Sequence, residues 1–201
     1  MNNLSLIKPY ADGIVVPKEY VYPQNDDGYI QSATKEVPDA QKQGFQVYVT
    51  GFANDMVKPH NYSYDPSAEY LQYIDNPQFT VDGFITDFPP TASQVVACFA
   101  KFNATGKMEQ QPLIISHNGA SGVYPGSTDL AYRQAVQDGA DVVDCSVQMS
   151  QDGIAFCLNS ADLTGNTDAL NKFMSQSVSV PEVQESPGVF SFNLKWSPHV
   201  L

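Results

Sequence analysis

Short apolar stretches alternate with helix-like segments along most of this chain. ADGIVV (11–16), FQVYVTGFAND (45–55) and VDGFITDFP (81–89) each have the composition of a buried strand, and a segment with helical spacing follows each of them. Two parallel strands need a long crossover connection, which is usually a helix. The alternation therefore predicts an α/β fold built on a parallel sheet.

Four segments carry the signals of helices, at 32–44, 65–76, 91–102 and 127–139. The second has a well-defined start, because Asp65 is a good capping residue and Pro66 suits the first turn. The fourth has two candidate caps, Ser127 and Thr128. Each of these helices lies between two expected strands, as a crossover helix does.

The alternation resumes after the polar stretch NATGKMEQQ (103–111), which is the best candidate for a linker. PLIISHNG (112–119) and ADVVDCSVQMS (140–150) are expected to be strands on either side of the fourth helix. The turn SQDG leads from the second of these into IAFCLNS (154–160), which predicts a hairpin. VFSFNLKW (189–196) alternates apolar and polar residues and is predicted to be one more strand.

Buried parallel strands joined by helices fit a doubly wound sheet or a (β/α) barrel. The chain has neither the GxGxxG spacing nor a GKS or GKT sequence, so a nucleotide-binding doubly wound domain has little support. In a barrel the functional residues lie at the carboxyl ends of the strands, where His117, Asp144, Asp87 and the pair Asn54–Asp55 fall. Helix capping is the alternative role for Asp55 and Asp87.

The charge balance narrows the possible partners. Ten basic and 22 acidic side chains give a net charge of −12, which repels phosphate backbones and anionic lipid headgroups. Nucleic acid is therefore not an expected partner. The first residues, MNNLSLIKPYADG, lack the basic and apolar regions of a signal peptide, and no apolar run has the roughly 20 residues of a membrane helix.

Sequons and cysteines point away from a cytosolic protein. Asn3, Asn61 and Asn103 each begin an acceptor sequence for N-glycosylation, provided that the chain is secreted. The three cysteines, Cys98, Cys145 and Cys157, fit no zinc spacing. Two alternatives remain for them, which are buried thiols or a Cys145–Cys157 disulfide between neighbouring strands.

Residues 117–160 carry four motifs in a familiar order. HNG (117–119) stands where a known pattern has HRG, PGST (125–128) where it has PENT, GADVVDCSVQMSQDG (139–153) where it has GAD-x-x-E-x-D and then DG, and LNS (158–160) where it has a histidine–aspartate pair. These motifs resemble the start of the glycerophosphodiester phosphodiesterase barrel, and specifically the second domain of the plant tandem-domain, cell-surface members. Residues 45–99 resemble the last strands of the preceding domain.

The resemblance implies a (β/α)8 TIM-barrel phosphodiesterase fold that is incomplete here. Such a barrel takes about 250 residues, and the chain has 201. Residues 1–102 would be the C-terminal part of a first barrel, 103–111 a linker and 112–201 the N-terminal part of a second, degenerate barrel. Because the last strand of a closed barrel pairs with the first, the strands near 82–87 and 113–116 are predicted to pair in an open part-barrel.

The family's chemistry assigns roles to individual positions. It uses two histidines as acid and base, an arginine on the phosphate, and a divalent cation, Ca²⁺ or Mg²⁺, held by carboxylates. The resemblance implies proton transfer for His117, with a purely structural histidine as the alternative, and a metal-ligand role for Asp144. Asn118 replaces the arginine and Asn159 the second histidine, as candidate substrate-binding residues. Further charged positions of the pattern hold Gly126, Ser146 and Ser160.

Two functions follow from the resemblance and from these departures. The first is a phosphoric diester hydrolase that converts a glycerophosphodiester and water to an alcohol and sn-glycerol 3-phosphate. The alternative is a catalytically weak or inactive barrel that binds cell-wall or phosphate-bearing ligands. In either case the parent protein is expected at the cell surface or in the cell wall, glycosylated and attached to the membrane through a lipid anchor.

Overall fold

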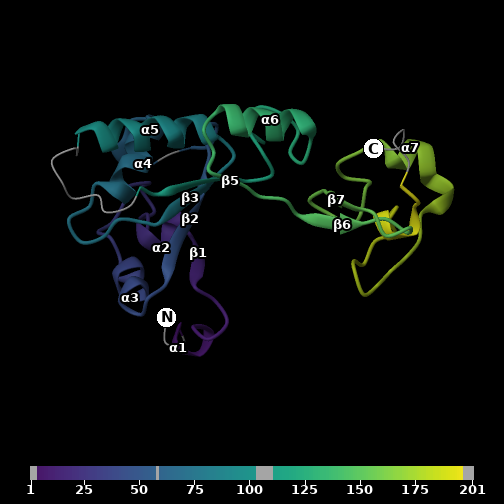
Figure 1. Ribbon diagram of the computed structural model, residues 1–201, viewed down its shortest axis with the longest axis horizontal. Coiled ribbons are helices and arrows are strands. Elements are labelled where there is room, and N and C mark those ends of the chain that lie inside the picture. The colour runs from purple at the N-terminus through teal and green to yellow at the C-terminus, as the bar shows by residue number, and fades with distance from the viewer. Residues whose placement is uncertain (1–3, 58, 103–110, 197–201) are drawn as a thin grey trace.

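The computed structural model describes residues 4–57, 59–102 and 111–196. Within these ranges the chain forms a larger lobe around one sheet and a small lobe around a hairpin, and a single extended segment connects the two (Figure 1). The predicted linker at 103–111 lies outside the described residues except for Gln111. None of the helices in the described ranges has the length and apolar character needed to cross a membrane.

Five parallel strands form the sheet in the order β1–β2–β3–β4–β5. Their bounds are β1 Gly13–Pro17, β2 Gln46–Phe52, β3 Gly83–Thr86, β4 Leu113–Ser116 and β5 Val142–Val143. This confirms the α/β prediction, and a parallel sheet with crossover helices fits a TIM-barrel-like fold. The predicted pairing across the polar stretch is also confirmed, because β3 and β4 run side by side from Gly83 opposite Leu113 to Thr86 opposite Ser116.

Helices precede the first strand of the sheet and separate the others. They are α1 Leu4–Ile7, α2 Lys18–Val21, α3 Glu36–Lys42, α4 Pro66–Ile74, α5 Pro89–Phe102 and α6 Asp129–Gln137, with a short 3-10 turn, η1, at His60–Tyr62. The predicted caps are seen, since Asp65 accepts a hydrogen bond from Ser67 N and Thr128, rather than Ser127, accepts one from Ala131 N. Helix α5 begins two residues before its predicted start, with both prolines in its first turn, where a missing N–H costs nothing.

The main core lies between the sheet and its helices. Val47 and Val49 of β2 are fully buried and pack in one cluster with residues of α3, α4 and α5. Successive strand residues face opposite sides of a sheet, and in β1 Val16 is 7% exposed whereas its neighbour Val15 is 55% exposed. One face of the sheet is therefore covered, and the other is open at the β1 edge.

A buried ion pair and a cluster of aromatic rings fill the carboxyl end of this core. Lys18 Nζ lies 2.6 Å from Glu69 Oε1, and the two side chains are 8% and 2% exposed. The ring of Phe52 stacks on Tyr70 at 4.6 Å and meets Phe84 edge-on at 5.1 Å. Burial raises the pKa of Tyr70, so its hydroxyl stays protonated and pairs with Thr86 Oγ1 at 2.6 Å.

The small lobe is built on the predicted hairpin, which is confirmed. Strands β6 Val147–Met149 and β7 Ala155–Cys157 pair antiparallel. A disulfide joins Cys145 to Cys157, whereas Cys98 is exposed and free, so of the two alternatives for the cysteines the structure has the disulfide. The rest of this lobe holds α7 Ala169–Phe173 and the 3-10 turns η2 Met174–Gln176 and η3 Ser191–Asn193.

Asp162 organises the loops of the small lobe. Its carboxylate accepts hydrogen bonds from Thr164 N, Gln184 Nε2 and Val189 N. Desolvation opposes ionisation, but these hydrogen bonds outweigh it and lower the pKa of Asp162 below its ordinary value. The ionised carboxylate therefore ties three segments around the small core of Leu163, Ala169, Val189 and Leu194.

Two strand predictions are wrong. Residues 140–150 form two strands in different sheets, because the chain leaves the parallel sheet after Val143 and pairs with β7 only from Val147. Residues 189–196 are not a strand, since Phe190 makes one bridge to Asp162 before the chain turns into η3. An alternating pattern fits a strand, but within the described residues this stretch pairs only through the bridge from Phe190 to Asp162.

Candidate functional site

His117 and Asp87 meet at the carboxyl edge of the sheet. Asp87 follows β3 and His117 follows β4, and because these strands are neighbours, the residues after them lie side by side. His117 Nδ1 lies 2.9 Å from Asp87 Oδ1, with the two side chains 52% and 40% exposed. The carboxylate of Asp87 thus faces the site and holds a histidine, which is not the capping role considered for it.

Thr86 and Ser121 fix the position of Asp87. The Thr86 hydroxyl donates to Phe52 O at 3.2 Å and accepts from Phe88 N at 3.0 Å, which anchors the chain on both sides of Asp87. Ser121 Oγ lies 2.8 Å from Asp87 Oδ1 and 2.6 Å from His117 O. Its one hydroxyl proton is shared between these two acceptors, so Ser121 ties the carboxylate to the loop that carries the histidine.

Asn118 contacts the other nitrogen of the His117 imidazole, Nε2. It is only 3% exposed, and its Nδ2 lies 3.1 Å from His117 Nε2. An amide nitrogen can only donate and a carboxylate can only accept, so these two partners suit the imidazole tautomer with its proton on Nδ1 and a lone pair on Nε2. Asn118 adopts φ 57°, a left-handed conformation that asparagine tolerates better than most residues.

Asn159 reaches the same edge from the small lobe. Ser127, in the turn before α6, lies with its Oγ 3.2 Å from Asn159 Oδ1 and 3.5 Å from Asn118 Oδ1. The predicted residues His117, Asn118 and Asn159 are therefore brought together through Ser127. The bridging roles of Ser121 and Ser127 were not predicted from the sequence. A serine in a glycine-rich loop or before a helix is normally interpreted as a turn or cap residue.

Asp144 lies at the end of β5, where its main-chain N–H donates to Ser116 O at 3.0 Å, and its side chain is partly exposed. Its predicted role was to hold a divalent cation. Within the described ranges, no three histidine, cysteine, aspartate or glutamate side chains gather closely enough to hold a metal ion. The donors present here do not fit the carboxylate-held cation that the family pattern implies.

The other predicted residues that the structure describes make their hydrogen bonds elsewhere or are exposed. Asn54 Nδ2 donates to Thr91 Oγ1 at 2.8 Å, and Asp55 is exposed. Asn61 is exposed in η1, and its Oδ1 accepts from Ile30 N at 2.9 Å. Of the three sequons this is the one whose asparagine the structure describes, since Asn3 and Asn103 lie outside the described residues.

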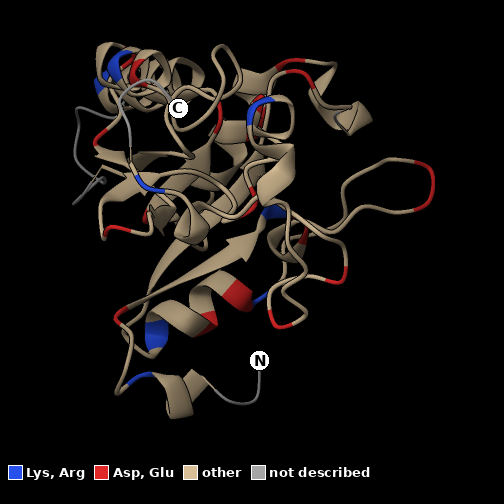
Figure 2. Ribbon diagram, turned by 90° about the vertical axis from the view of Figure 1, so that its right-hand side faces the viewer, with Lys and Arg blue, Asp and Glu red and all other residues tan. Residues whose placement is uncertain are grey.

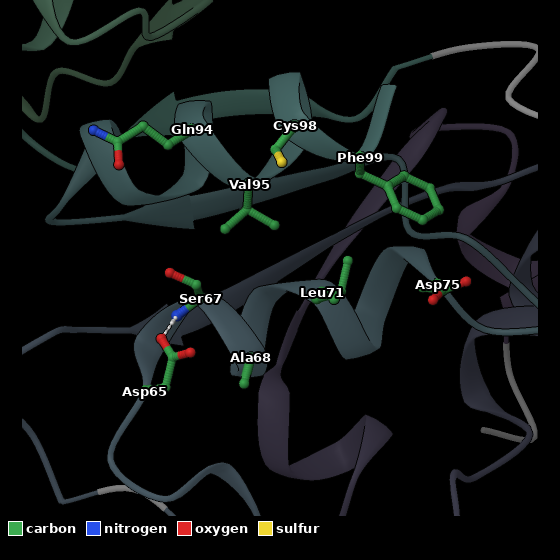
Figure 3. Close-up of a pocket in the computed structure, with 9 residues that line it drawn as sticks. All are labelled: Asp65, Ser67, Ala68, Leu71, Asp75, Gln94, Val95, Cys98 and Phe99. Atoms are coloured by element: carbon green, nitrogen blue, oxygen red, sulfur yellow. Dashed lines mark hydrogen bonds between the residues drawn. The ribbon is translucent and has the colours of Figure 1, made fainter. Parts of the chain in front are cut away.

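A groove lies on the outer side of the larger lobe, between α4 and α5 (Figure 3). Its volume is about 610 Å³, with Leu71, Val95 and Phe99 on its walls and Asp65 and Asp75 at its ends. The groove holds none of the residues of the His117 network. Acidic positions are spread over several loops and helices, as Figure 2 shows, rather than gathered at one site.

The comparison with known proteins finds a family match for part of the chain. Residues 117–189, which begin at His117 and include Asn159, match the glycerophosphoryl diester phosphodiesterase family. This part of the chain is therefore similar to a family of phosphodiesterases.

The similarity to individual plant proteins extends over almost the whole chain. It is 58% identical over 97% of its length to glycerophosphodiester phosphodiesterase GDPDL7 of Arabidopsis thaliana, and 57% identical over 97% to GDPDL6 of the same plant. GDPDL1, also from Arabidopsis thaliana, is 52% identical over 98% of the chain. In each case the match covers 26% of the relative, so the chain spans about a quarter of the length of these proteins. No solved structure matches the chain.

Proposed function

We propose that this chain supplies a proton-transfer site for glycerophosphodiester hydrolysis, which yields an alcohol and sn-glycerol 3-phosphate. The observation that carries the proposal is the pairing of His117 with Asp87, 2.9 Å apart at the carboxyl edge of the sheet. A neutral imidazole held by a carboxylate is a common general base near neutral pH. The names of the relatives and the family match support the same reaction class.

In this mechanism His117 takes the proton of the attacking water. The water oxygen forms a bond to phosphorus while the bond from phosphorus to the alcohol oxygen breaks, and the proton passes from water to Nε2 and then to the leaving oxygen. Asp87 accepts the hydrogen bond from Nδ1 throughout, so it stabilises the imidazolium that forms between the two transfers. Asn118 must release Nε2 before the first transfer, because its Nδ2 donates to that lone pair.

The neutral amides favour a second candidate, a weakly active or inactive domain that binds a phosphate-bearing or cell-wall ligand. Asn118 and Asn159 stand where the family pattern has an arginine and a histidine, and an amide offers hydrogen bonds but no positive charge. The described residues also gather no metal-binding group. Such a site recognises hydroxyl and phosphoryl oxygens without supplying charge stabilisation for their transfer.

One experiment separates the two candidates. The purified protein is incubated with glycerophosphocholine, with and without a chelator and with added Ca²⁺ or Mg²⁺, and sn-glycerol 3-phosphate is measured enzymatically. Steady release of sn-glycerol 3-phosphate supports the hydrolase, and its loss with the chelator would show that a cation takes part. No release, together with calorimetric binding of glycerophosphocholine, supports the binding domain, and absence of both release and binding contradicts both candidates.

We also propose how the chain relates to its longer relatives. Residues 1–102 would be the C-terminal part of one phosphodiesterase barrel, 103–111 a linker and 112–201 the N-terminal part of a second, degenerate barrel. The motivation is the order of strands, since β3 and β4 pair as the last and first strands of a barrel would. Mild proteolysis of the longer protein tests this: cleavage within 103–111 that releases two folded domains supports the division, whereas fragments that stay together indicate one sheet shared through β3 and β4.

We propose that the parent protein is extracellular, and the disulfide supports this location. The Cys145–Cys157 disulfide suits an oxidising compartment such as the cell surface or cell wall. The exposed Asn61 is then available for glycosylation, and a lipid anchor on the parent protein would hold it at the plasma membrane. Expression in plant cells, followed by glycosidase treatment, should lower the apparent mass of the wild type by one glycan more than that of Asn61→Gln.

A further inference from the structure

Ser127 stands between two asparagines that come from different lobes. Asn118 follows β4 of the sheet, whereas Asn159 follows β7 of the hairpin. The Ser127 hydroxyl lies 3.5 Å from Asn118 Oδ1 and 3.2 Å from Asn159 Oδ1, so both amide oxygens compete for its single proton. This hydroxyl joins the small lobe to the carboxyl edge of the sheet.

The backbone conformation of Ser127 is energetically unfavourable for a residue other than glycine. Its hydroxyl is also not needed to cap helix α6. Its φ is 63°, in the left-handed region that few residues other than glycine, asparagine and aspartate adopt. The capping hydrogen bond of α6 is made by Thr128, whose Oγ1 accepts from Ala131 N at 3.2 Å. Backbone strain of this kind persists where surrounding contacts fix it, and here these are the main-chain hydrogen bond from Ser127 N to Asn118 O at 2.9 Å and the side-chain contacts with the two amides.

The orientation of the Asn118 amide depends on this contact. With Oδ1 turned toward Ser127, the Nδ2 end points at His117 Nε2, at 3.1 Å. The opposite orientation would set a carbonyl oxygen against the lone pair of Nε2. Ser127 therefore acts through Asn118 on the imidazole, and favours the tautomer with its proton on Nδ1.

The disulfide keeps Asn159 within reach of Ser127. Asn159 lies two residues after Cys157, which is bonded to Cys145, the residue directly after Asp144. Next to the disulfide, Leu158 N donates to Ser146 O at 2.9 Å. The end of the hairpin that carries Asn159 is thus tied to the segment that leaves the sheet at Asp144.

We propose that Ser127 is a positioning residue, which holds the amides of Asn118 and Asn159 in one arrangement beside His117, and that the Cys145–Cys157 disulfide holds Asn159 in place for it. The inference rests on the proposed function, because it concerns the same site. The amide nitrogens are the donors that this arrangement offers to the oxygen acceptors of a phosphodiester or a phosphate group.

Ser127→Gly is the test variant, since glycine adopts the left-handed backbone freely and lacks only the hydroxyl. The side-chain amide signals of Asn118 and Asn159 in ¹⁵N NMR spectra of the full chain should both shift, while the melting temperature stays the same or rises. Limited proteolysis between β5 and β6 should become several-fold faster. Amide signals that coincide with those of the wild type would overturn the proposal.

The cysteine variants provide a second test and a matched control. Cys157→Ser breaks the disulfide and should shift the Asn159 signal although Ser127 is present, whereas Cys98→Ser, at the exposed thiol of α5, should leave it unchanged. An unchanged Asn159 signal in Cys157→Ser would contradict the role of the disulfide. All these signals are read without substrate, so failure of diester hydrolysis would refute the proposed function and leave the positioning role standing.

Discussion

The buried pair of Lys18 and Glu69 allows a quantitative test of the core beneath the site. At 2.6 Å, with side chains 8% and 2% exposed, the two charges have little contact with water. Glu69→Leu keeps a similar volume but leaves the ammonium group buried without its carboxylate. Removing one partner of a buried pair costs about 3–5 kcal/mol, which corresponds to a fall in melting temperature of roughly 6–20 °C for a chain of this size.

The double variant Lys18→Met/Glu69→Leu separates charge from packing. Replacing a buried ion pair by apolar residues of similar volume is often neutral or stabilising. We therefore expect the double variant to unfold within about 1 kcal/mol of the wild type, while the single variant shows the full loss. Unfolding is followed by circular dichroism in urea and on heating. The reasoning is refuted if Glu69→Leu costs less than about 1 kcal/mol, or if the double variant is as unstable as the single one.

Three further predictions concern the site and the small lobe. Asp87→Asn should lower the rate of diester hydrolysis about tenfold and change the imidazole ¹⁵N shifts of His117; unchanged shifts would remove its positioning role. Cys157→Ser should lower the free energy of unfolding by about 3 kcal/mol, from a loop of 12 residues, and a loss near zero would contradict this. Because the folded-state pKa of Asp162 is depressed, its stabilisation is present above the ordinary value of 3.8 and lost as pH falls through the folded value. On acidification the melting temperature of the wild type should therefore fall more than that of Asp162→Asn. Equal falls in the two melting temperatures would contradict the role of the Asp162 carboxylate.

Local sequence signals predicted the larger lobe well. Strands β1 to β4 are short apolar runs that end at turn residues, and the start of α4 is set by Asp65 and Pro66, which act within one turn of the chain. The pairing of β3 with β4 was also predictable, since the resemblance to a barrel supplied the order of strands. Because β3 and β4 are parallel neighbours, the residues after their carboxyl ends, Asp87 and His117, lie close together.

The parts that sequence reasoning missed depend on contacts between distant segments. The apolar and polar alternation continues through 140–150, but the chain leaves the parallel sheet after Val143. The later residues pair with β7 in another sheet and are tied to it by the disulfide. The stretch 189–196 alternates as well, yet in the part of the chain that the structure describes it forms only the bridge from Phe190 to Asp162. The hydroxyls of Ser121 and Ser127 gain their roles only through residues brought next to them by folding.

The most direct test of the central claim is the hydrolysis of glycerophosphocholine by wild type, His117→Ala and His60→Ala. His60 is an exposed histidine in η1 whose ring packs against Tyr29, outside the hydrogen-bond network of His117, and it controls for loss of an imidazole. We predict that His117→Ala lowers the release of sn-glycerol 3-phosphate about 10²- to 10⁴-fold, while His60→Ala retains the wild-type rate. Equal rates for wild type and His117→Ala would contradict the proton-transfer role of His117.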